Sequence, residues 1–443
     1  MIARAAGWLT REARSVGARE SGLTLLGSLG RLGLGFVASV LLARTLGPSG
    51  YGLIALLSLV LSVVDTLADF GLTYTAVHKV ARAVADGLPR AMPLATGYWS
   101  LTLLLNAAGT VGGLLLAEPI ARLALGRPEA ESQVRLVLLG LVTVAGSGAV
   151  VALLQSTRRF GRLALLQVST ATTYLAGILA LNAVGQLGVE QVVLLGVLNP
   201  LVGLIVGLRL LPPGLLRPSL GFAPLARRTW GELATFSRWL WISSVLSLLA
   251  GQLDLALVGR WLPAVEVGLY ALALNLATKL DILNQARFTV LLPAVATLEA
   301  SRGIRGHALQ ALFRSILLAA PFALAVPLAQ PLVLLVYGPD YLGAVPVLLV
   351  LILGVVFDLL TTPLLLLAFP LNAPRVLAGS DLLRLATLGI LCAALIPSLG
   401  PLGAALAKLA AKLVGAAFTL IALWWIAARP ADTRRSDRRS APT

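Results

Sequence analysis

The chain is poor in the residues that most disulfide and metal sites use. It has one cysteine and two histidines among 443 residues, and only 12% of its residues are charged. Cys392 therefore cannot form a disulfide within the chain or share a site with other thiolates. His78 and His307 are separated by most of the chain, which favours isolated interfacial positions over a shared metal site. We expect no cofactor.

Two motifs of catalytic chemistry are also absent. None of the four lysines follows a glycine, so the chain has no Walker A motif for nucleotide phosphates. It has no G-x-S-x-G nucleophile motif, and no polar segment is long enough for a separate catalytic domain. These absences favour transport over enzymatic chemistry. A membrane-bound glycan polymerase or ligase stays as the enzymatic alternative.

Hydrophobic residues make up 58% of the chain, and the mean hydropathy is +0.91. Apolar runs recur between residues 21 and 427, and at roughly 20 residues each they can cross ~30 Å of hydrocarbon as helices. Lipid cannot satisfy backbone polar groups, and the runs exceed the ~10-residue strands of a membrane barrel. The sequence therefore predicts an all-α, multi-pass membrane protein.

We expect about twelve transmembrane helices in this chain. They cover approximately residues 22–43, 51–77, 92–117, 134–156, 163–184, 190–211, 236–259, 265–295, 309–336, 344–370, 376–396 and 402–427. Lys and Arg gather in alternate loops, which predicts that both termini are cytoplasmic because positive charge is retained on that side. Since these loops also account for much of the +16 net charge and lack aromatic stacking residues, nucleic acid is not an expected partner.

A weak internal repeat divides the predicted helices into two halves. At an offset of 216 residues (260 minus 44), Arg44–Thr73 aligns without gaps on Arg260–Thr289, with matching Arg, Gly and Asp residues. This offset favours two parallel six-helix bundles. The expected organisation is a cytoplasmic amphipathic N-terminus (1–20), an N-terminal bundle (21–211), a cytoplasmic linker (212–235), a C-terminal bundle (236–428) and a basic cytoplasmic tail (429–443).

Charged side chains inside the predicted helices mark candidate site residues. Each costs ~2.5–3.5 kcal/mol at the bilayer centre, so most should face a water-filled cavity or one another. The set comprises Arg31, Asp65, Asp69, Asp254, Lys279, Asp281, Asp358, Lys408 and Lys412. Lys408 and Lys412 could instead snorkel to the interface, and contact with the substrate is a further alternative.

The acidic members are candidate cavity residues. Asp65 and Asp69 are four residues apart and so share one helix face. Asp254 and Asp281 join them as candidate sites for Na+ or proton coupling, whose presence stays open. A drug or cation antiporter would use such an acidic cavity.

The basic members are candidates for holding an anion between the bundles. Arg31 and Lys279 lie deep within their predicted helices, and Arg287 would extend the basic track. The alternative is that these side chains pair with Asp65, Asp69 and Asp281 to hold helices together.

Several segments, taken in order, resemble a known transporter family. They are Leu41–Gly52, Ala68–Leu72, Gln155–Ala164, Asp254–Arg260, Val267–Ala273 and Tyr337–Pro346. The chain is similar in these segments to the polysaccharide transporters, or oligosaccharide flippases, of the MATE-like multidrug/oligosaccharidyl-lipid/polysaccharide exporter superfamily. The resemblance covers nearly the whole chain.

This resemblance implies a V-shaped pair of six-helix bundles around a central cavity. Alternating access would carry a polyprenyl-pyrophosphate-linked oligosaccharide across a bacterial cytoplasmic membrane, with Arg31, Lys279 and Arg287 as candidates for holding the pyrophosphate. Membrane lipids and other polysaccharide-assembly proteins are the further partners that it implies. The twelve-helix count departs from the fourteen helices of peptidoglycan-precursor flippases, which disfavours lipid II as the substrate.

Overall fold

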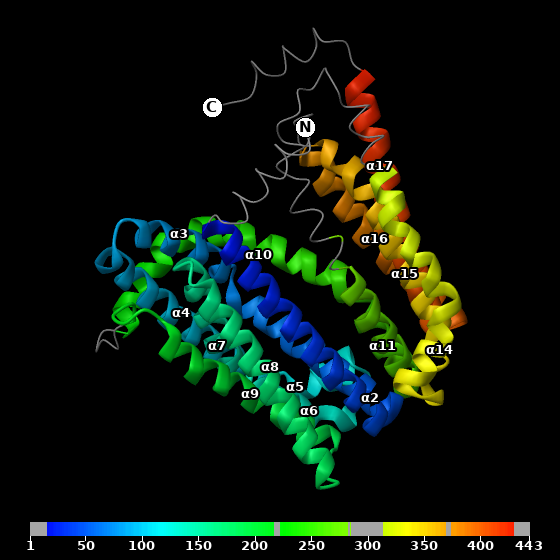
Figure 1. Cartoon of the computed structure of the whole chain (residues 1–443), viewed down its shortest axis with the longest axis horizontal. Helices are drawn as coiled ribbons and strands as arrows, with labels where there is room; N and C mark the ends of the chain where they lie inside the picture. Colours follow the sequence, from blue (N-terminus) through cyan, green and yellow to red (C-terminus); the bar gives the residue numbers. More distant parts are fainter. Residues whose placement is uncertain (1–15, 217–221, 282–283, 285–312, 369–373, 429–443) are drawn as a thin grey trace, which may run out of the picture. The chain divides into compact units, whose positions relative to one another are not determined.

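The computed structural model describes residues 16–216, 222–281, 284, 313–368 and 374–428. Over these residues the chain forms helices and no β-strand (Figure 1). Nine of the described helices are long and apolar enough to cross a membrane, or ten if the bent pair Leu88–Leu115 and Ala117–Ala124 is one span. The predicted all-α membrane fold is confirmed. The total of twelve helices and the orientation stay predictions.

The chain divides into two compact units, which are described separately. Unit 1 comprises Met1–Leu248 and unit 2 comprises Leu249–Thr443. The division lies inside the 40-residue helix α10 (Phe222–Trp261), which begins within the segment expected as a linker. Pro224 lies in the first turn of α10, where a proline is tolerated because its missing N–H has no helical partner.

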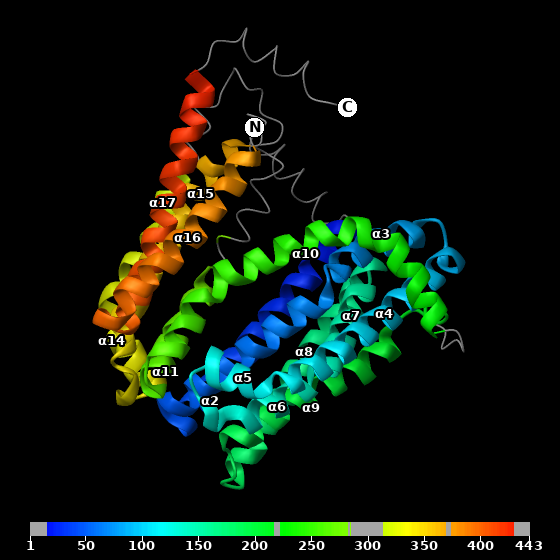
Figure 2. The ribbon, with the colours of Figure 1, turned by 180° about the vertical axis from the view of Figure 1, so that it is seen from behind.

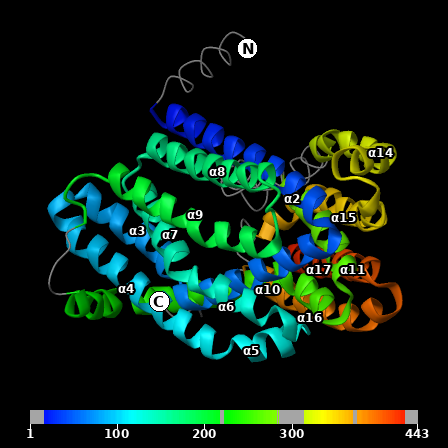
Figure 3. The same cartoon turned by 90° about the horizontal axis from the view of Figure 1, so that it is seen from below.

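Unit 1 contains the first part of α10 and the helices that precede it. They are α2 (Val16–Asp69), α3 (Leu72–Ala85), α4 (Leu88–Leu115), α5 (Ala117–Pro119), the π-helical turn η1 (Ile120–Ala124), the 3-10 turn η2 (Pro128–Ala130), α6 (Glu131–Leu139), α7 (Leu141–Ser156), α8 (Phe160–Ala183) and α9 (Val189–Leu210). Helix α2 packs along α8, and α9 contacts both α7 and α8 (Figure 3). Buried apolar residues of α3, α4 and α7 form the core.

Small residues allow these helices to approach closely. A Cβ atom at Gly27 of α2 would lie 2.5 Å from the Cβ of Ala164 in α8, and one at Gly207 of α9 would lie 2.4 Å from Cγ1 of Val150 in α7. Close packing of this kind holds membrane helices together, since lipid provides no hydrophobic drive for their association.

Helix α2 contains a break that separates two expected spans. Gly47 has φ 64° and ψ 179° and is followed by Pro48, a backbone conformation that essentially only glycine adopts. The break between α10 and α11 (Ala264–Leu280) contains Pro263, with φ −58° and ψ 156°. These two breaks are 216 residues apart (263 minus 47), which is the offset of the sequence repeat.

Unit 2 contains the last part of α10 and the helices that follow it. They are α11, η3 (Ala320–Leu324), α14 (Ala325–Tyr337), η4 (Pro339–Tyr341), α15 (Ala344–Leu365), η5 (Leu366–Ala368), α16 (Pro374–Leu399) and α17 (Pro401–Ala428). Helices α16 and α17 form a hairpin around Gly400, and α17 also packs against α15 (Figure 2). Helix α11 contacts α15 and, to a lesser extent, α17.

Candidate functional site

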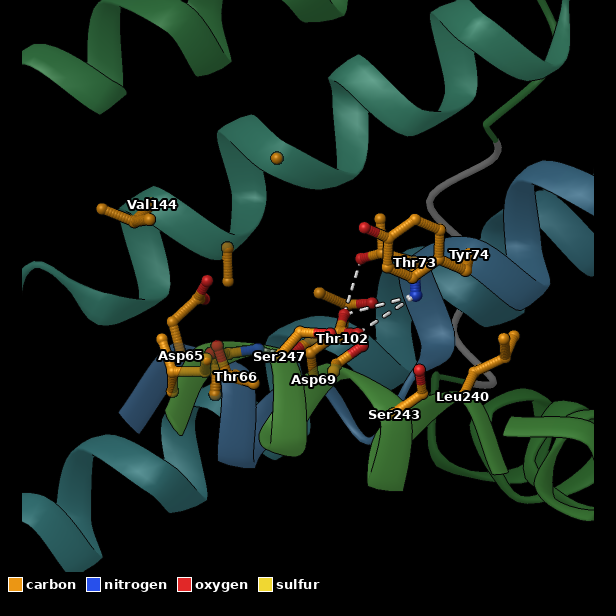
Figure 4. A pocket seen from close by; sticks show the side chains of 15 residues that line it. Asp65, Thr66, Asp69, Thr73, Tyr74, Thr102, Val144, Leu240, Ser243 and Ser247 are labelled. Atoms are coloured by element: carbon orange, nitrogen blue, oxygen red, sulfur yellow. Dashed lines mark hydrogen bonds between the residues drawn. The ribbon is translucent and has the colours of Figure 1, made fainter. Parts of the chain in front are cut away.

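A polar cavity of about 690 Å³ lies within unit 1 (Figure 4). Its volume is within the range of about 300–1,000 Å³ that is typical of small-ligand sites. Side chains from α2, α3, α4, α7 and the unit 1 part of α10 line it. The polar lining residues are Asp65, Thr66, Asp69, Thr73, Tyr74, Thr102, Asn106, Ser243, Ser244 and Ser247.

A helix break shapes one wall of this cavity. Helix α2 ends at Asp69 and α3 begins at Leu72, and between them Phe70 and Gly71 have positive φ angles of 48° and 69°. The Asp69 carboxylate accepts hydrogen bonds from Thr73 Oγ1 (2.6 Å) and from the backbone N–H of Thr73 (3.3 Å). The expectation of one continuous span over 51–77 was therefore wrong. Because of the break, the first backbone N–H groups of α3 have no helical carbonyl to bind. The Asp69 carboxylate supplies an acceptor for one of them, the N–H of Thr73.

Helix α10 is packed tightly against the same break. A Cβ atom at Gly71 would lie 2.5 Å from the carbonyl oxygen of Ser237 and 2.7 Å from the backbone nitrogen of Trp241. The ring of Phe70 stacks on Trp241 with centroids 5.3 Å apart, and it meets Trp230 edge-on at 5.9 Å. These contacts fix the stretch of α10 that supplies the cavity's serines.

The cavity has acidic side chains and no basic side chain in its lining. Within the described part of the chain, no residue pairs with or donates a hydrogen bond to the Asp65 carboxylate. Asn106 is 1% exposed, and its Oδ1 atom has no hydrogen-bond partner among the described residues. Unpartnered acceptors are costly in a membrane domain. This site is therefore suited to a ligand that donates hydrogen bonds or carries positive charge.

Unit 2 contains a buried ion pair at Asp254. This carboxylate is 0% exposed, and its Oδ2 atom accepts hydrogen bonds from Lys408 Nζ (2.7 Å) and from the Tyr270 hydroxyl. The Lys408 ammonium also donates to the carbonyl oxygen of Gly251 at 2.9 Å. The structure thus places Asp254, one of the candidate coupling residues, in a pair with an internal ammonium group.

A second ion pair lies one turn further along α17. Lys412 Nζ is 2.6 Å from the Asp358 carboxylate of α15, and the Arg384 guanidinium of α16 is 3.7 Å from it. Both lysine ammonium groups thus meet carboxylates, in line with charged side chains that face one another, and this pairing replaces the snorkelling that was the alternative for Lys408 and Lys412. Sequence reasoning missed Arg384, although its position inside the predicted span 376–396 was an available signal.

The remaining candidate residues lie apart from these clusters. Arg31 is exposed on α2, while Lys279 of α11 donates a hydrogen bond to Asn275 Oδ1. Asp281 follows α11 and accepts a hydrogen bond from Asn284 Nδ2 at 2.7 Å. Arg287 lies outside the described residues. Since Arg31 and Lys279 belong to different units, their joint action on one anion stays a prediction.

The helical architecture is that of a MATE-like membrane transporter fold. An inward-facing MATE family transporter of the MOP superfamily matches with a TM-score of 0.66 and 14% identity, over 91% of this chain and 98% of that chain. The lipid II flippase MurJ, in an inward closed conformation, matches with a TM-score of 0.64 and 14% identity, over 91% of this chain and 87% of that chain. At these identities the likeness establishes the fold alone.

Sequence comparison then places the chain within one family of this class. Residues 41–346 match the family described as polysaccharide biosynthesis protein, and the chain belongs to that family. It is 26% identical to the lipopolysaccharide biosynthesis protein WzxC of Escherichia coli (strain K12) over 275 residues, 60% of this chain and 52% of that protein. The match therefore spans about half the length of this curated relative. The family resemblance expected from the sequence is confirmed.

Proposed function

We propose that the protein is a flippase for a polyprenyl-pyrophosphate-linked oligosaccharide. It moves this lipid from the cytoplasmic to the outer leaflet of a bacterial inner membrane, for the biosynthesis of a cell-surface polysaccharide. The observation that carries the proposal is the match of residues 41–346 to polysaccharide biosynthesis proteins in a chain with a transporter fold. The name of the WzxC relative and the fold of MurJ support it.

The proposed mechanism is alternating access without covalent chemistry. The sugar head group crosses through polar space between membrane helices, such as the cavity in unit 1, while the prenyl tail stays in the lipid. Sugar hydroxyls need hydrogen-bond partners throughout this path because the hydrocarbon offers none. On this proposal the protein is a transporter and not an enzyme. Its partners are the lipid-linked oligosaccharide, membrane lipids and other polysaccharide-assembly proteins.

Basic side chains hold the pyrophosphate in this proposal. Arg31 offers a guanidinium, which binds phosphate oxygens in bidentate geometry, and Lys279 offers a compact ammonium group. Lys279 is only partly buried, and its described hydrogen bond is with Asn275 on its own helix. Arg287 is the third candidate.

Arg31→Ala and Lys279→Ala should each slow translocation by at least about tenfold, the loss expected when about 1.4 kcal/mol of transition-state stabilisation is removed.

Proteoliposomes provide the test of this function. Purified protein is reconstituted with a lipid-linked oligosaccharide on one leaflet, and its appearance on the other is followed with a membrane-impermeant glycosidase. Arg90→Ala is the matched control, because this side chain is 75% exposed and pairs with the exposed Asp86 in the turn between α3 and α4. Absence of translocation by the wild-type protein would overturn the proposed function. Full activity in both Arg31→Ala and Lys279→Ala would reject the phosphate site alone.

The acidic lining of the unit 1 cavity favours a second candidate function, a MATE-type antiporter for cationic drugs. Asp65 and Asp69 would then bind Na+, a proton or the drug itself, and Asp254 and Asp281 would be the corresponding candidates in unit 2. The same proteoliposomes separate the two functions. An antiporter would accumulate a cationic dye in response to a Na+ or proton gradient and would leave the lipid-linked oligosaccharide where it was added.

A further inference from the structure

The unit 1 cavity presents hydrogen-bond acceptors that lack donors. The Asp65 carboxylate has no partner in the described part of the chain, whereas the Asp69 carboxylate is engaged by Thr73. Asn106 donates its Nδ2–H to the carbonyl oxygen of Thr102 at 3.0 Å. Its Oδ1 atom is buried and has no described partner, and the residue lines the same cavity. Two independent acceptors on α2 and α4 are therefore available to donors from a ligand or from water that a ligand displaces.

We infer that this cavity holds sugar residues of the transported lipid and selects them by charge. It accepts neutral sugars and amino sugars, and it rejects sugars that carry a carboxylate. This inference rests on the proposed flippase function and assigns to unit 1 the recognition of the sugar, as distinct from the pyrophosphate. The inference depends on the unpartnered acceptors of Asp65 and Asn106.

Hydrogen-bonding groups and one aromatic ring fit this ligand. Sugar hydroxyls donate to Asp65 and Asn106, and the hydroxyl groups of Ser243 and Ser247 on α10 can donate or accept in return. The ring of Tyr74 lines the cavity and is 64% exposed, so it offers an apolar face with a polar tip. Such a face suits the C–H side of a sugar ring.

Charge determines which sugars are excluded. Asp65 and Asp69 are the charged residues of the lining, and both are acidic. A carboxylate on the sugar would add a third negative charge within a few ångströms of Asp65. At an effective dielectric constant of about 20, such repulsion lowers affinity by about tenfold or more. An ammonium group in the same position gains a charge-assisted hydrogen bond.

Three matched substrates test the inference in proteoliposomes. They are polyprenyl-pyrophosphate-linked disaccharides whose outer sugar is glucose, glucosamine or glucuronate. The wild-type protein should translocate the first two at least about tenfold faster than the third at subsaturating concentration. Asp65→Asn keeps the side-chain shape and removes the charge, so it should reduce this difference to less than about threefold. Asp86→Asn, at a carboxylate that is 62% exposed outside the cavity, should keep the wild-type preference.

Each outcome separates this inference from the proposed function. Equal rates for all three substrates in the wild-type protein overturn the sugar selectivity and leave the flippase function standing. Failure to translocate any of them overturns the function itself. Thermal unfolding with and without Na+, in the absence of substrate, gives an independent readout. Stabilisation of the wild type but not of Asp65→Asn, together with equal rates, would assign the cavity to a metal cation and overturn the inference.

Discussion

At the residue scale, unit 2 shows how charge is kept inside a membrane domain. Asp254 is fully buried, and the Lys408 ammonium lies 2.7 Å from it. Removing one partner of a buried pair leaves an uncompensated charge, which is worse than having neither charge. The pair therefore ties α10 to α17, and its energetic role differs from that of the exposed pairs of unit 1.

We predict that Lys408→Met lowers the free energy of unfolding by about 3–5 kcal/mol, since it leaves Asp254 buried without a cation. Adding Asp254→Asn should restore much of the loss, because the double variant contains no buried charge at this position. The measurement is denaturant unfolding in detergent micelles. Arg122→Met is the control, because its pair with Glu118 is exposed, and it should cost about 0–1 kcal/mol. If Lys408→Met behaved like this control, the buried pair would contribute no measurable stability.

Sequence spacing predicts faces of helices but not the partners across them. The separation of Asp65 and Asp69 by four residues was enough to place them on one face, and both line the cavity. By contrast, Lys408 meets a carboxylate that is 154 residues away in the sequence. No periodicity encodes that contact, because it depends on which helices become neighbours in the folded unit.

At the element scale, the break between α2 and α3 positions one wall of the cavity. Two consecutive residues, Phe70 and Gly71, have positive φ angles, and the backbone of α10 lies directly against Gly71. Phe70 is held by stacking on Trp241. The strain of the break is thus offset by packing against α10.

We predict that Gly71→Ala destabilises unit 1 by more than Gly185→Ala does. Both glycines have nearly the same φ, 69° and 68° respectively, so both substitutions incur a left-handed backbone cost of about 1–2 kcal/mol. A Cβ atom at Gly185 would meet nothing within 4 Å, whereas one at Gly71 would collide with the backbone of α10. Thermal unfolding of the two variants in detergent compares them. Equal melting temperatures would show that α10 can move away from the break without cost.

Hydropathy alone could not predict this break. Residues 51–77 are apolar enough on average to be predicted as one span across Phe70 and Gly71, and a hydropathy average does not contain backbone angles. The break at Gly47 was easier to anticipate, because Gly47-Pro48 is a strong turn signal. Helix boundaries are therefore predictable where glycine and proline coincide, and less so where a tertiary contact stabilises a single glycine.

At the scale of the whole molecule, composition predicted the fold class, and the resemblance of several segments predicted the family. Membrane insertion restricts the chain to helices, so 58% hydrophobic residues led directly to an all-α fold. The division into units lies at Leu248 and Leu249, inside a continuous helix, and no change in composition marks that position. Loop charge predicts the orientation independently of these features.

We predict that a cysteine at Asp340 is accessible from outside the cell. Asp340 is exposed in the η4 turn between α14 and α15, and the predicted orientation places this loop on the side that carries few Lys and Arg residues. In a Cys392→Ala background, Asp340→Cys should react with a membrane-impermeant maleimide in intact spheroplasts. Arg159→Cys, in a basic loop between α7 and α8, should react only after the membrane is permeabilised. The opposite labelling pattern would place the basic loops outside, against the positive-inside rule, and would reverse the direction of the proposed lipid translocation relative to the chain.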